Sequence, residues 1–214
     1  KNPMETLLFE TAVRKLQNLE ILVYPTETYF AIGGSALSAA AVAEVYRAKD
    51  RDKDLPLPVI IGDLSQLEML TGDPDADVEM LISHFWPGPL TIIMPAGPGV
   101  PPLLTAGTGR VAVRLSSHFE ASRLAQAAGF PLVSSSANIS GQKPVTSAKE
   151  LDPGIVKAVA GDVYTGGLPP GGGAPSTIVE LCGVRGGGKM LHILREGAVP
   201  ASSFIKLGFA CNIK

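Results

Sequence analysis

Hydrophobic and polar positions along the chain switch between a helical and an extended period. In residues 5–18, apolar side chains recur at helical spacing, which predicts an amphipathic opening helix. Residues 20–25 form a short apolar run that ends in proline, which is typical of a buried strand. We expect a loop over 26–38 and then a helix over 39–49, with Ser38 as its N-cap.

The rest of the chain continues to alternate between strands and helices. Further helices are predicted over 63–70, 76–86 and 118–129, the last of which ends at Gly129. Further strands are predicted over 56–62, 90–96, 110–115, 130–135, 176–181 and 189–196. No strict βαβ rhythm, internal repeat or linker is visible in this pattern. It predicts a single α/β domain over residues 1–214, built on a twisted, mixed sheet with flanking helices.

The composition fits a globular protein with a hydrophobic core. Of the 214 residues, 45% are hydrophobic and 18% are charged. The formal net charge of −2 argues against non-specific electrostatic binding of the kind that a nucleic-acid coat protein shows, although it does not exclude a local basic patch. Cys182 and Cys211 have no metal spacing and give no disulfide framework, so we expect reduced thiols. Because neither a signal peptide nor a membrane-spanning apolar run is found, we expect a cytoplasmic protein.

Three consecutive serines, Ser134, Ser135 and Ser136, follow an apolar run in the segment PLVSSSANISG (131–141). A nucleophilic serine requires a base and a group that orients that base. The nucleophile-elbow motif is absent, however, and none of the three histidines has a recognisable partner in the sequence. A helix cap would use only one of the serines. An anion cradle, in which hydroxyls, backbone N–H groups and a helix N-terminus surround a phosphate or carboxylate, would use all of them.

Candidate cations for such an anion site lie in the segment YRAKDRDKDLPLP. Lys49 and Arg51 stand two residues apart at the end of a predicted helix, and Lys53 follows. Such a charge run commonly forms a solvated loop, but this one leads directly into a predicted strand. Arg binds phosphate oxygens in a bidentate manner, and Lys offers a compact point charge. Arg114 and Arg195 are further candidates, because an Arg on a buried strand normally has an anionic partner.

Two glycine-rich segments have to be distinguished from phosphate-binding loops. Residues 183–189 match the spacing of a phosphate loop, but Met190 stands where that motif needs Ser or Thr. The segment also joins two predicted strands, whereas a phosphate loop leads into a helix. We therefore expect a flexible hairpin at this position. Residues 169–177 lack a preceding strand and a lysine, and we expect a mobile loop there that leads into Ser176.

The segment PTETYFAIGG (25–34) is a further candidate for ligand binding. It offers two threonine hydroxyls, and its paired glycines would allow a ligand to approach the backbone closely. An ordinary strand-to-helix connection would not explain the apolar side chains of Tyr29, Phe30 and Ile32 within it. These side chains would be accounted for if they packed over a pocket.

Taken together, six motifs resemble those of the YrdC family. They occur in the family's order and near its spacing over about residues 20–198, and they read YPTETYFAIGG, KDRDKDLPLP, FWPGPLT, VAVRL, SANISG and STIVEL. The resemblance implies a twisted α/β sheet around a concave, positively lined cavity. It also implies a nucleotidyltransferase that makes threonylcarbamoyl-adenylate from L-threonine, bicarbonate and ATP, with Mg²⁺, and releases pyrophosphate. The product would serve N6-threonylcarbamoyladenosine formation at tRNA position 37, through separate transferase proteins that partner the short bacterial form.

The resemblance further implies which residues bind ATP. The family's K-x-R and S-x-N patterns fall on Lys49, Arg51, Ser136 and Asn138, which would hold the nucleotide and its phosphates. Of these, Lys49 and Arg51 would be the catalytic cations. Arg195 would be an additional ATP contact. The resemblance assigns no metal ligand among the side chains.

The threonine side of the cavity is implied in the same way. It would consist of Thr28, Arg114, Ser134 and Ser176, with the Arg114 guanidinium pairing with the carboxylate of the amino acid. Several positions depart from the family's common pattern and bear on individual ATP contacts more than on the reaction: Phe30, Ala31, Leu55, Arg110 and Pro144.

Two alternative functions remain open at this point. One is an RNA-binding or assembly module of the same fold without catalysis, since members of the family bind structured RNA. The slightly acidic balance of charge and the intact K-x-R and S-x-N patterns weigh against this alternative. The other is the carbamoyl-adenylate module of hydrogenase-maturation proteins, which is embedded in much longer chains with zinc-finger segments.

Overall fold

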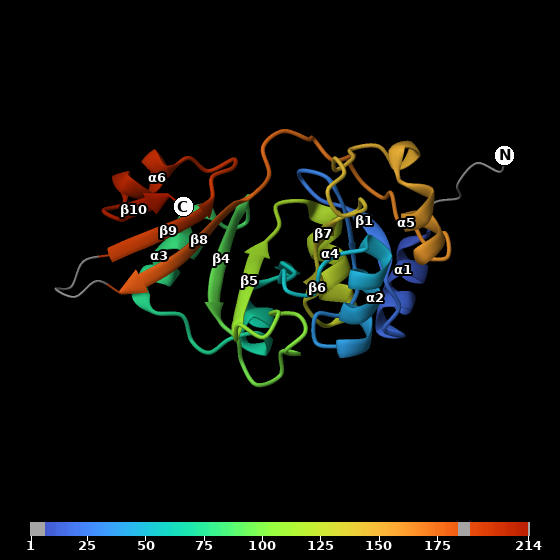
Figure 1. Cartoon of the computed structure of the whole chain (residues 1–214), viewed down its shortest axis with the longest axis horizontal. Coiled ribbons are helices and arrows are strands. Elements are labelled where there is room, and N and C mark those ends of the chain that lie inside the picture. The colour runs from blue at the N-terminus through green and yellow to red at the C-terminus, as the bar shows by residue number, and fades with distance from the viewer. Residues whose placement is uncertain (1–6, 184–188, 214) are drawn as a thin grey trace.

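The computed structural model describes residues 7–183 and 189–213 (Figure 1). The helices and strands follow one another in the order α1 (Phe9–Gln17), β1 (Leu22–Pro25), β2 (Phe30–Gly33), α2 (Ala39–Lys49), β3 (Val59–Ile61), η1 (Leu64–Met69), α3 (Ala76–Phe85), β4 (Leu90–Pro95), β5 (Arg110–Leu115), α4 (Phe119–Ala128), β6 (Leu132–Val133), β7 (Ser135–Ser136), η2 (Ala148–Glu150), α5 (Pro153–Ala158), β8 (Thr177–Gly183), β9 (Lys189–Arg195), α6 (Ala201–Lys206) and β10 (Ala210–Ile213).

The strands form two sheets that meet near the middle of the molecule. The larger sheet has the order β10-β9-β8-β4-β5-β3-β6, and the smaller has the order β1-β2-β7. The larger sheet is mixed, because β3 runs parallel to β5 but antiparallel to β6. A bridge between Ser35 and Leu132 joins the two sheets, and the Val133 N–H donates to the Gly34 carbonyl oxygen at 2.9 Å. This arrangement confirms the mixed α/β fold predicted from the sequence.

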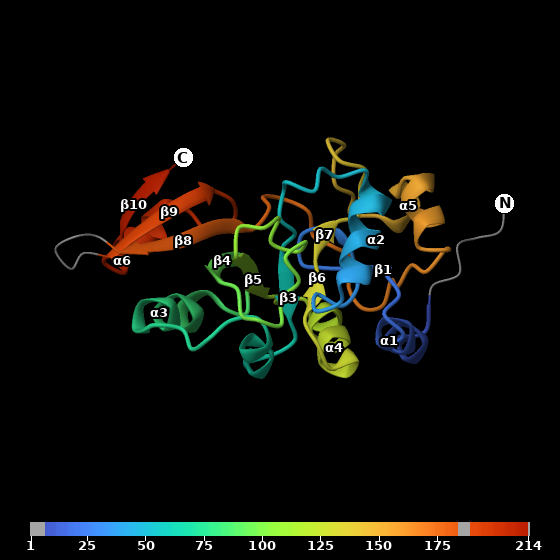
Figure 2. The same cartoon turned by 60° about the horizontal axis from the view of Figure 1, so that its bottom comes forward.

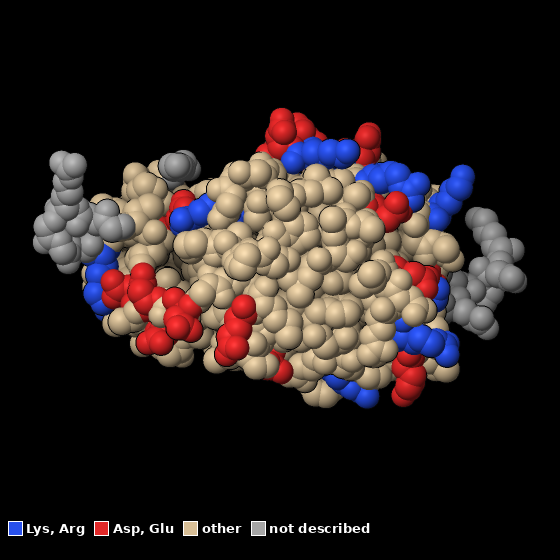
Figure 3. Space-filling view, turned by 90° about the horizontal axis from the view of Figure 1, so that it is seen from below, with Lys and Arg blue, Asp and Glu red and all other residues tan. Residues whose placement is uncertain are grey.

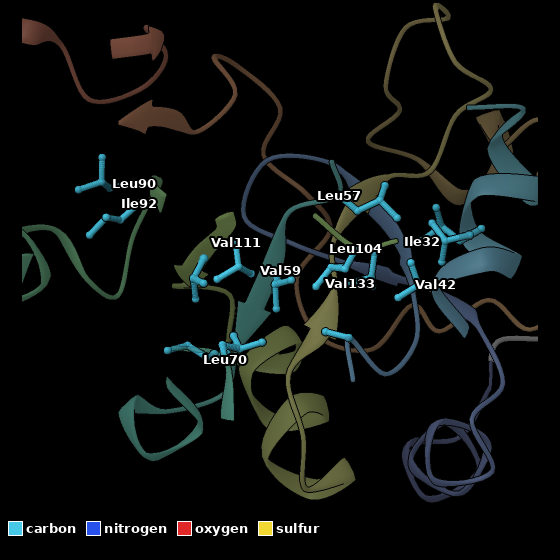
Figure 4. Close-up of a cluster of buried hydrophobic side chains, with 14 of the residues drawn as sticks. Ile32, Val42, Leu57, Val59, Leu70, Leu90, Ile92, Leu104, Val111 and Val133 are labelled. Atoms are coloured by element: carbon cyan, nitrogen blue, oxygen red, sulfur yellow. The ribbon is translucent and has the colours of Figure 1, made fainter. Parts of the chain in front are cut away.

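Helices cover both sides of the strands. Figure 2 shows α1, α3 and α4 along one side and α2 and α5 on the other. Successive residues of a strand point to opposite faces, and on β3 Ile60 packs into the cluster that contains Leu124 of α4, whereas Val59 and Ile61 pack into the larger cluster. Figure 4 shows part of this larger cluster, in which Val42 of α2 lies beside Ile32 of β2.

Local capping explains where several helices begin and end. Ser38 caps α2 as predicted, since its side chain accepts a hydrogen bond from the Ala41 N–H. Asp75 caps α3 by accepting from two backbone N–H groups. Helix α4 ends at Gly129, which adopts a left-handed conformation with φ of 87°. These helices agree with their predicted positions.

Some predicted boundaries are wrong. The loop expected over 26–38 contains β2, whose four residues are all buried and therefore lack the alternation that marks a half-buried strand. The strand expected over 130–135 is divided between β6 and β7, which belong to different sheets. Segment 63–70 forms a 3-10 helix instead of an α-helix. The short elements α5, α6 and β10 were not predicted, because runs of four to six residues carry little periodicity.

Gly33 shows why the paired glycines are needed. A Cβ atom at this position would lie 1.7 Å from the carbonyl oxygen of Val133, so only glycine fits where β2 crosses β6. Neither Gly33 nor Gly34 lines the cavity that opens between the two sheets. The expectation that these glycines admit a ligand is therefore wrong, because the group that approaches them is the protein's own backbone.

Strands β8 and β9 pair antiparallel, as expected for the two arms of a hairpin. Residues 184–188, on which the expected flexible hairpin loop falls, lie outside the described residues. Cys182 and Cys211 are free thiols. Among the helices that the structure describes, none has the length and apolar character needed to cross a bilayer.

Candidate functional site

A cavity of about 680 Å³ opens where the two sheets meet. Its wall combines residues of β2 and β7 from the small sheet with residues of β3, β4, β5, β8 and β9 from the large one. Eight of the nine residues expected at the site line it: Thr28, Arg51, Arg114, Ser134, Ser136, Asn138, Ser176 and Arg195. The remaining one, Lys49, does not line the cavity.

The serine cluster lies at the crossing between the sheets. Ser135 and Ser136 pair with Ile32 and Ala31 of β2. Ser134 lies between β6 and β7, and its N–H donates to the Pro58 carbonyl oxygen at 2.8 Å. All three serines line the cavity, and none of the three histidines does. This geometry provides no histidine base for a serine and is consistent with a wall of hydroxyl groups around a ligand.

Lys49 supports the S-x-N segment from outside the cavity lining. Its side chain is only 2% exposed, and its ammonium donates to the carbonyl oxygens of Ser136 and of Asn138, the latter at 2.6 Å. The Ser140 N–H in turn donates to the Lys49 carbonyl oxygen at 2.8 Å. Burial, assisted by the nearby charge of Arg51, lowers the pKa of Lys49 to about 8. The Lys49 ammonium therefore binds backbone carbonyl oxygens of the protein. The sequence had instead predicted that it contacts phosphate.

Asn138 carries a buried acceptor without a partner in the described chain. Its Nδ2 donates to the carbonyl oxygens of Ile139 and Gln142 at 2.9 and 2.8 Å. Its Oδ1 is buried and accepts no hydrogen bond from any described residue. Because buried polar atoms are normally paired, a donor on a ligand would complete this site.

Arg51 is oriented by the chain that follows it. Its Nε and Nη2 donate to the carbonyl oxygens of Leu55 and Pro56 at 3.3 and 3.1 Å. Leu55 and Pro144, two of the departures from the family pattern, also line the cavity. A third departure, Arg110, does not line it and pairs instead with Glu180 at 2.6 Å.

Arg195 and Ser176 form one hydrogen-bonded unit with Thr91. Arg195 donates to the Ser176 carbonyl oxygen from Nε and Nη2, and from Nη2 also to the Ser176 hydroxyl at 3.0 Å. The Thr91 hydroxyl donates to the same Ser176 oxygen at 2.9 Å. Partial burial and the nearby positive charge of Arg114 lower the pKa of Arg195. Thr91 was missed in the sequence, although it lies in the quoted motif FWPGPLT.

Arg114 has a carboxylate partner of its own. Its Nη1 forms an ion pair with Glu27, and the Ser116 hydroxyl donates to the other oxygen of Glu27 at 2.5 Å. The anionic partner that the sequence required for a buried Arg is therefore present in the protein. Glu27 was missed as a functional residue, although it directly precedes Thr28 in the motif PTETY.

The loop over 169–177 is attached to the turn that carries Thr28. The Gly171 and Gly172 N–H groups donate to the carbonyl oxygens of Glu27 and Thr28 at 3.2 and 2.8 Å. The Tyr29 hydroxyl donates to the Gly173 carbonyl oxygen at 2.5 Å. Tyr29 and Phe30 line the cavity as predicted, while Ile32 belongs to the core.

The charges of the cavity contrast with those of one outer face of the molecule. Three guanidinium groups line the cavity, whereas Figure 3 shows a face whose middle is uncharged and whose margin mixes basic and acidic side chains. Within the described ranges, no group of three or more His, Cys, Asp or Glu side chains could hold a metal ion. The cavity is thus suited to anions.

A family model for Sua5, YciO and YrdC proteins, described as "Telomere recombination", matches residues 14–197. The chain belongs to this family. It is 39% identical over 170 residues to a threonylcarbamoyl-AMP synthase of Bacillus subtilis, a match covering 79% of this chain and 49% of the relative. It is 38% identical over 170 residues to the enzyme of that name from Stenotrophomonas maltophilia, covering 77% of this chain and 91% of the relative.

Among solved structures, Sua5 of Pyrococcus abyssi complexed with L-threonine matches with a TM-score of 0.81 and 31% sequence identity. This match covers 95% of the present chain and 58% of Sua5. The chain thus spans about half the length of the Bacillus relative and more of the Stenotrophomonas one. Family membership and the twisted α/β fold predicted from the motifs are confirmed.

Proposed function

We propose that the chain is an L-threonylcarbamoyladenylate synthase, an enzyme that joins L-threonine, bicarbonate and ATP into threonylcarbamoyl-AMP and releases pyrophosphate. The observation that carries the proposal is the convergence of Arg51, Arg114 and Arg195 with Asn138 and the serines of β7 on one cavity. These groups come from segments far apart in the sequence. The relatives named threonylcarbamoyl-AMP synthase support the same reaction.

ATP would occupy the side of the cavity formed by Arg51, Ser136, Asn138 and Arg195. The two guanidinium groups suit phosphate oxygens, which Arg contacts through paired N–H groups. The unpaired Oδ1 of Asn138 would accept a hydrogen bond from the nucleotide. Lys49 would act on this side indirectly, by holding the backbone of the S-x-N segment.

L-Threonine would occupy the side formed by Thr28, Arg114, Ser134 and Ser176. In this position the Arg114 guanidinium would pair with the substrate carboxylate, and hydroxyl groups would contact the rest of the amino acid. The complex of P. abyssi Sua5 with L-threonine supports an amino-acid site in this fold.

The chemistry needs alignment and charge neutralisation more than a covalent nucleophile. Bicarbonate supplies CO₂ with loss of hydroxide. The neutral amine of threonine then attacks the CO₂ carbon, forms a C–N bond and loses a proton to give a carbamate. A carbamate oxygen attacks the α-phosphorus of ATP, and the bond to the β-phosphate oxygen breaks, so that pyrophosphate leaves with the electron pair. Arg51 and Arg195 would stabilise the charge that develops on the phosphates.

Mg²⁺ is proposed as a companion of the ATP phosphates, where this ion is commonly held with few protein ligands. The described residues offer no cluster of carboxylates for it, so we assign it no protein ligand. The product is proposed to serve N6-threonylcarbamoyladenosine formation at tRNA position 37 through separate transferase proteins.

The direct test is product identification by mass spectrometry. The protein is incubated with ATP, Mg²⁺, L-threonine and isotopically labelled bicarbonate. We expect threonylcarbamoyl-AMP that carries the label, and no such product when threonine is omitted. Conversion of ATP to AMP without label incorporation, or tight RNA binding without any adenylate product, would contradict the proposal.

A further inference from the structure

The carboxylate of Glu27 lies behind the guanidinium of Arg114, the most buried cationic side chain that lines the cavity. The side chains of Arg114 and Glu27 are only 9% and 17% exposed, and they form an ion pair through Nη1 and Oε1. Arg114 lines the cavity, and Glu27 does not. The carboxylate therefore contacts the guanidinium from the protein side and leaves its cavity side free.

We infer that Glu27 is a positioning residue, which fixes the Arg114 guanidinium in the orientation that receives the carboxylate of an amino-acid substrate. This inference rests on the proposed function, because it deepens the role of Arg114 in the threonine site. Glu27 itself would not touch the substrate.

Glu27 is held rigidly enough to do this. The Ser116 hydroxyl donates to its Oε2 at 2.5 Å, so each carboxylate oxygen has a separate partner. Its main-chain oxygen accepts from the Gly171 N–H at 3.2 Å. The turn that carries it is closed by the Thr26 hydroxyl, which donates to the Tyr29 carbonyl oxygen at 2.7 Å.

The two partners of Glu27 lie at the end of β5, with Arg114 on the strand and Ser116 directly after it. Arg114 and Ser116 are two residues apart, and in an extended chain such residues point to the same side. A single carboxylate can therefore bridge both side chains. The Ser116 hydroxyl oxygen also accepts from the His118 N–H at 3.2 Å, which fixes the serine in turn.

The guanidinium keeps donors available for a ligand. Nη1 is occupied by Glu27, while Nε and Nη2 of Arg114 make no hydrogen bond within the described part of the chain. A carboxylate is recognised by two parallel N–H groups of one guanidinium. Because Glu27 already fixes this side chain, binding would cost less conformational entropy than with a free Arg.

The inference is tested with the purified full chain and three substitutions. Glu27→Ala removes the carboxylate, and Glu27→Gln keeps an oxygen that can accept from Arg114. Glu44→Ala is the matched control, because Glu44 pairs with Arg47 on the exposed surface of α2. Heteronuclear NMR follows the order of the Arg114 Nε–H group, which is assigned by its loss in Arg114→Lys. Calorimetry measures the dissociation constants of L-threonine and of ATP separately.

For Glu27→Ala we expect a mobile Arg114 Nε–H group and an L-threonine dissociation constant raised about tenfold, since a hydrogen bond to a charged group contributes on that order. The dissociation constant of ATP should stay within about twofold of the wild-type value. The L-threonine dissociation constant of Glu27→Gln should lie between those of Glu27→Ala and wild type. The inference would be overturned by an Arg114 signal that stays ordered in Glu27→Ala, or by threonine and ATP affinities that fall equally. A wild type that bound no L-threonine would contradict the proposed function, while the NMR signal would still decide whether Glu27 orders Arg114.

Discussion

The ammonium of Lys49 lies 2.6 Å from the carbonyl oxygen of Asn138, a residue 89 positions further along the chain. This contact joins the K-x-R and S-x-N motifs directly through the protein. Lys49 therefore stabilises the segment that carries Ser136 and Asn138. Arg51 is the member of the K-x-R pair that lines the cavity.

The hydrogen bonds of Lys49 predict that the substitution Lys49→Met has a local effect on the S-x-N segment. Without the ammonium, two carbonyl oxygens lose their donor, so the segment 134–142 should become more flexible. We expect faster hydrogen exchange in this segment and a loss of activity of about a hundredfold, similar to removal of an oriented catalytic donor. Lys53→Met is the matched control, because Lys53 is exposed in the same charge run. Unchanged exchange in Lys49→Met, together with weaker ATP binding, would instead indicate direct contact with phosphate.

The lowered pKa of Lys49 predicts a pH dependence of stability. Its value of about 8 in the folded protein lies below the 10.5 of an unperturbed lysine, so between these values the unfolded chain binds more protons. The contribution of Lys49 to the free energy of unfolding should therefore rise with pH, by about 2 kcal/mol between roughly pH 8 and 9.5. Urea unfolding of wild type and Lys49→Met over this range isolates the effect. A difference between the two proteins that stayed constant with pH would contradict the assigned pKa.

Gly33 predicts a severe and specific loss of stability. In Gly33→Ala, the new methyl group would lie 1.7 Å from the Val133 carbonyl oxygen, so the backbone of β2 or β6 must move. We expect destabilisation of about 3 kcal/mol or more, as for other substitutions that force a core to shift. Thermal unfolding provides the measurement. Gly72→Ala is the control, since nothing lies within 4 Å of a Cβ at that position, and equal effects of the two substitutions would be inconsistent with the close crossing.

Arg110 departs from the family pattern without belonging to the cavity. It pairs with Glu180 at 2.6 Å, and both side chains are partly exposed. We expect Arg110→Thr to keep pyrophosphate release within about twofold and to cost about 1 kcal/mol at most, since such ion pairs contribute little. Steady-state kinetics and thermal unfolding would check both values. A loss of activity far beyond this range would indicate a role for Arg110 in the reaction.

Much of the fold could be predicted, because most helices carry clear periodicity and caps. Helix α2 was placed with its N-cap at Ser38, and α4 with its end at Gly129. Strand β2 escaped prediction because both of its faces are buried. The division between β6 and β7 was also not predicted. The sequence shows one continuous run of apolar residues and serines, and only strand pairing in the folded protein assigns its two parts to different sheets at Ser134.

The site was predictable as a set of residue types, although the contacts between them were not. The motifs indicated which side chains face the cavity, and Lys49 is the exception. Its interaction with backbone carbonyl groups cannot be read from a motif, because main-chain oxygens have no sequence signal. Glu27 and Thr91 were missed for a similar reason, since their importance depends on Arg114 and Ser176 lying beside them in space.

The central claim is best tested by measuring pyrophosphate release from ATP with Mg²⁺ and bicarbonate, with and without L-threonine. The comparison uses wild type, Arg51→Ala and the control Arg47→Ala, whose guanidinium pairs with Glu44 on the surface of α2, the helix that precedes Arg51. We predict threonine-dependent release that falls about a hundredfold in Arg51→Ala and is unchanged in Arg47→Ala. Release that ignores threonine, or that is equal in the two variants, would contradict the assignment of this cavity as the site of threonylcarbamoyl-AMP synthesis.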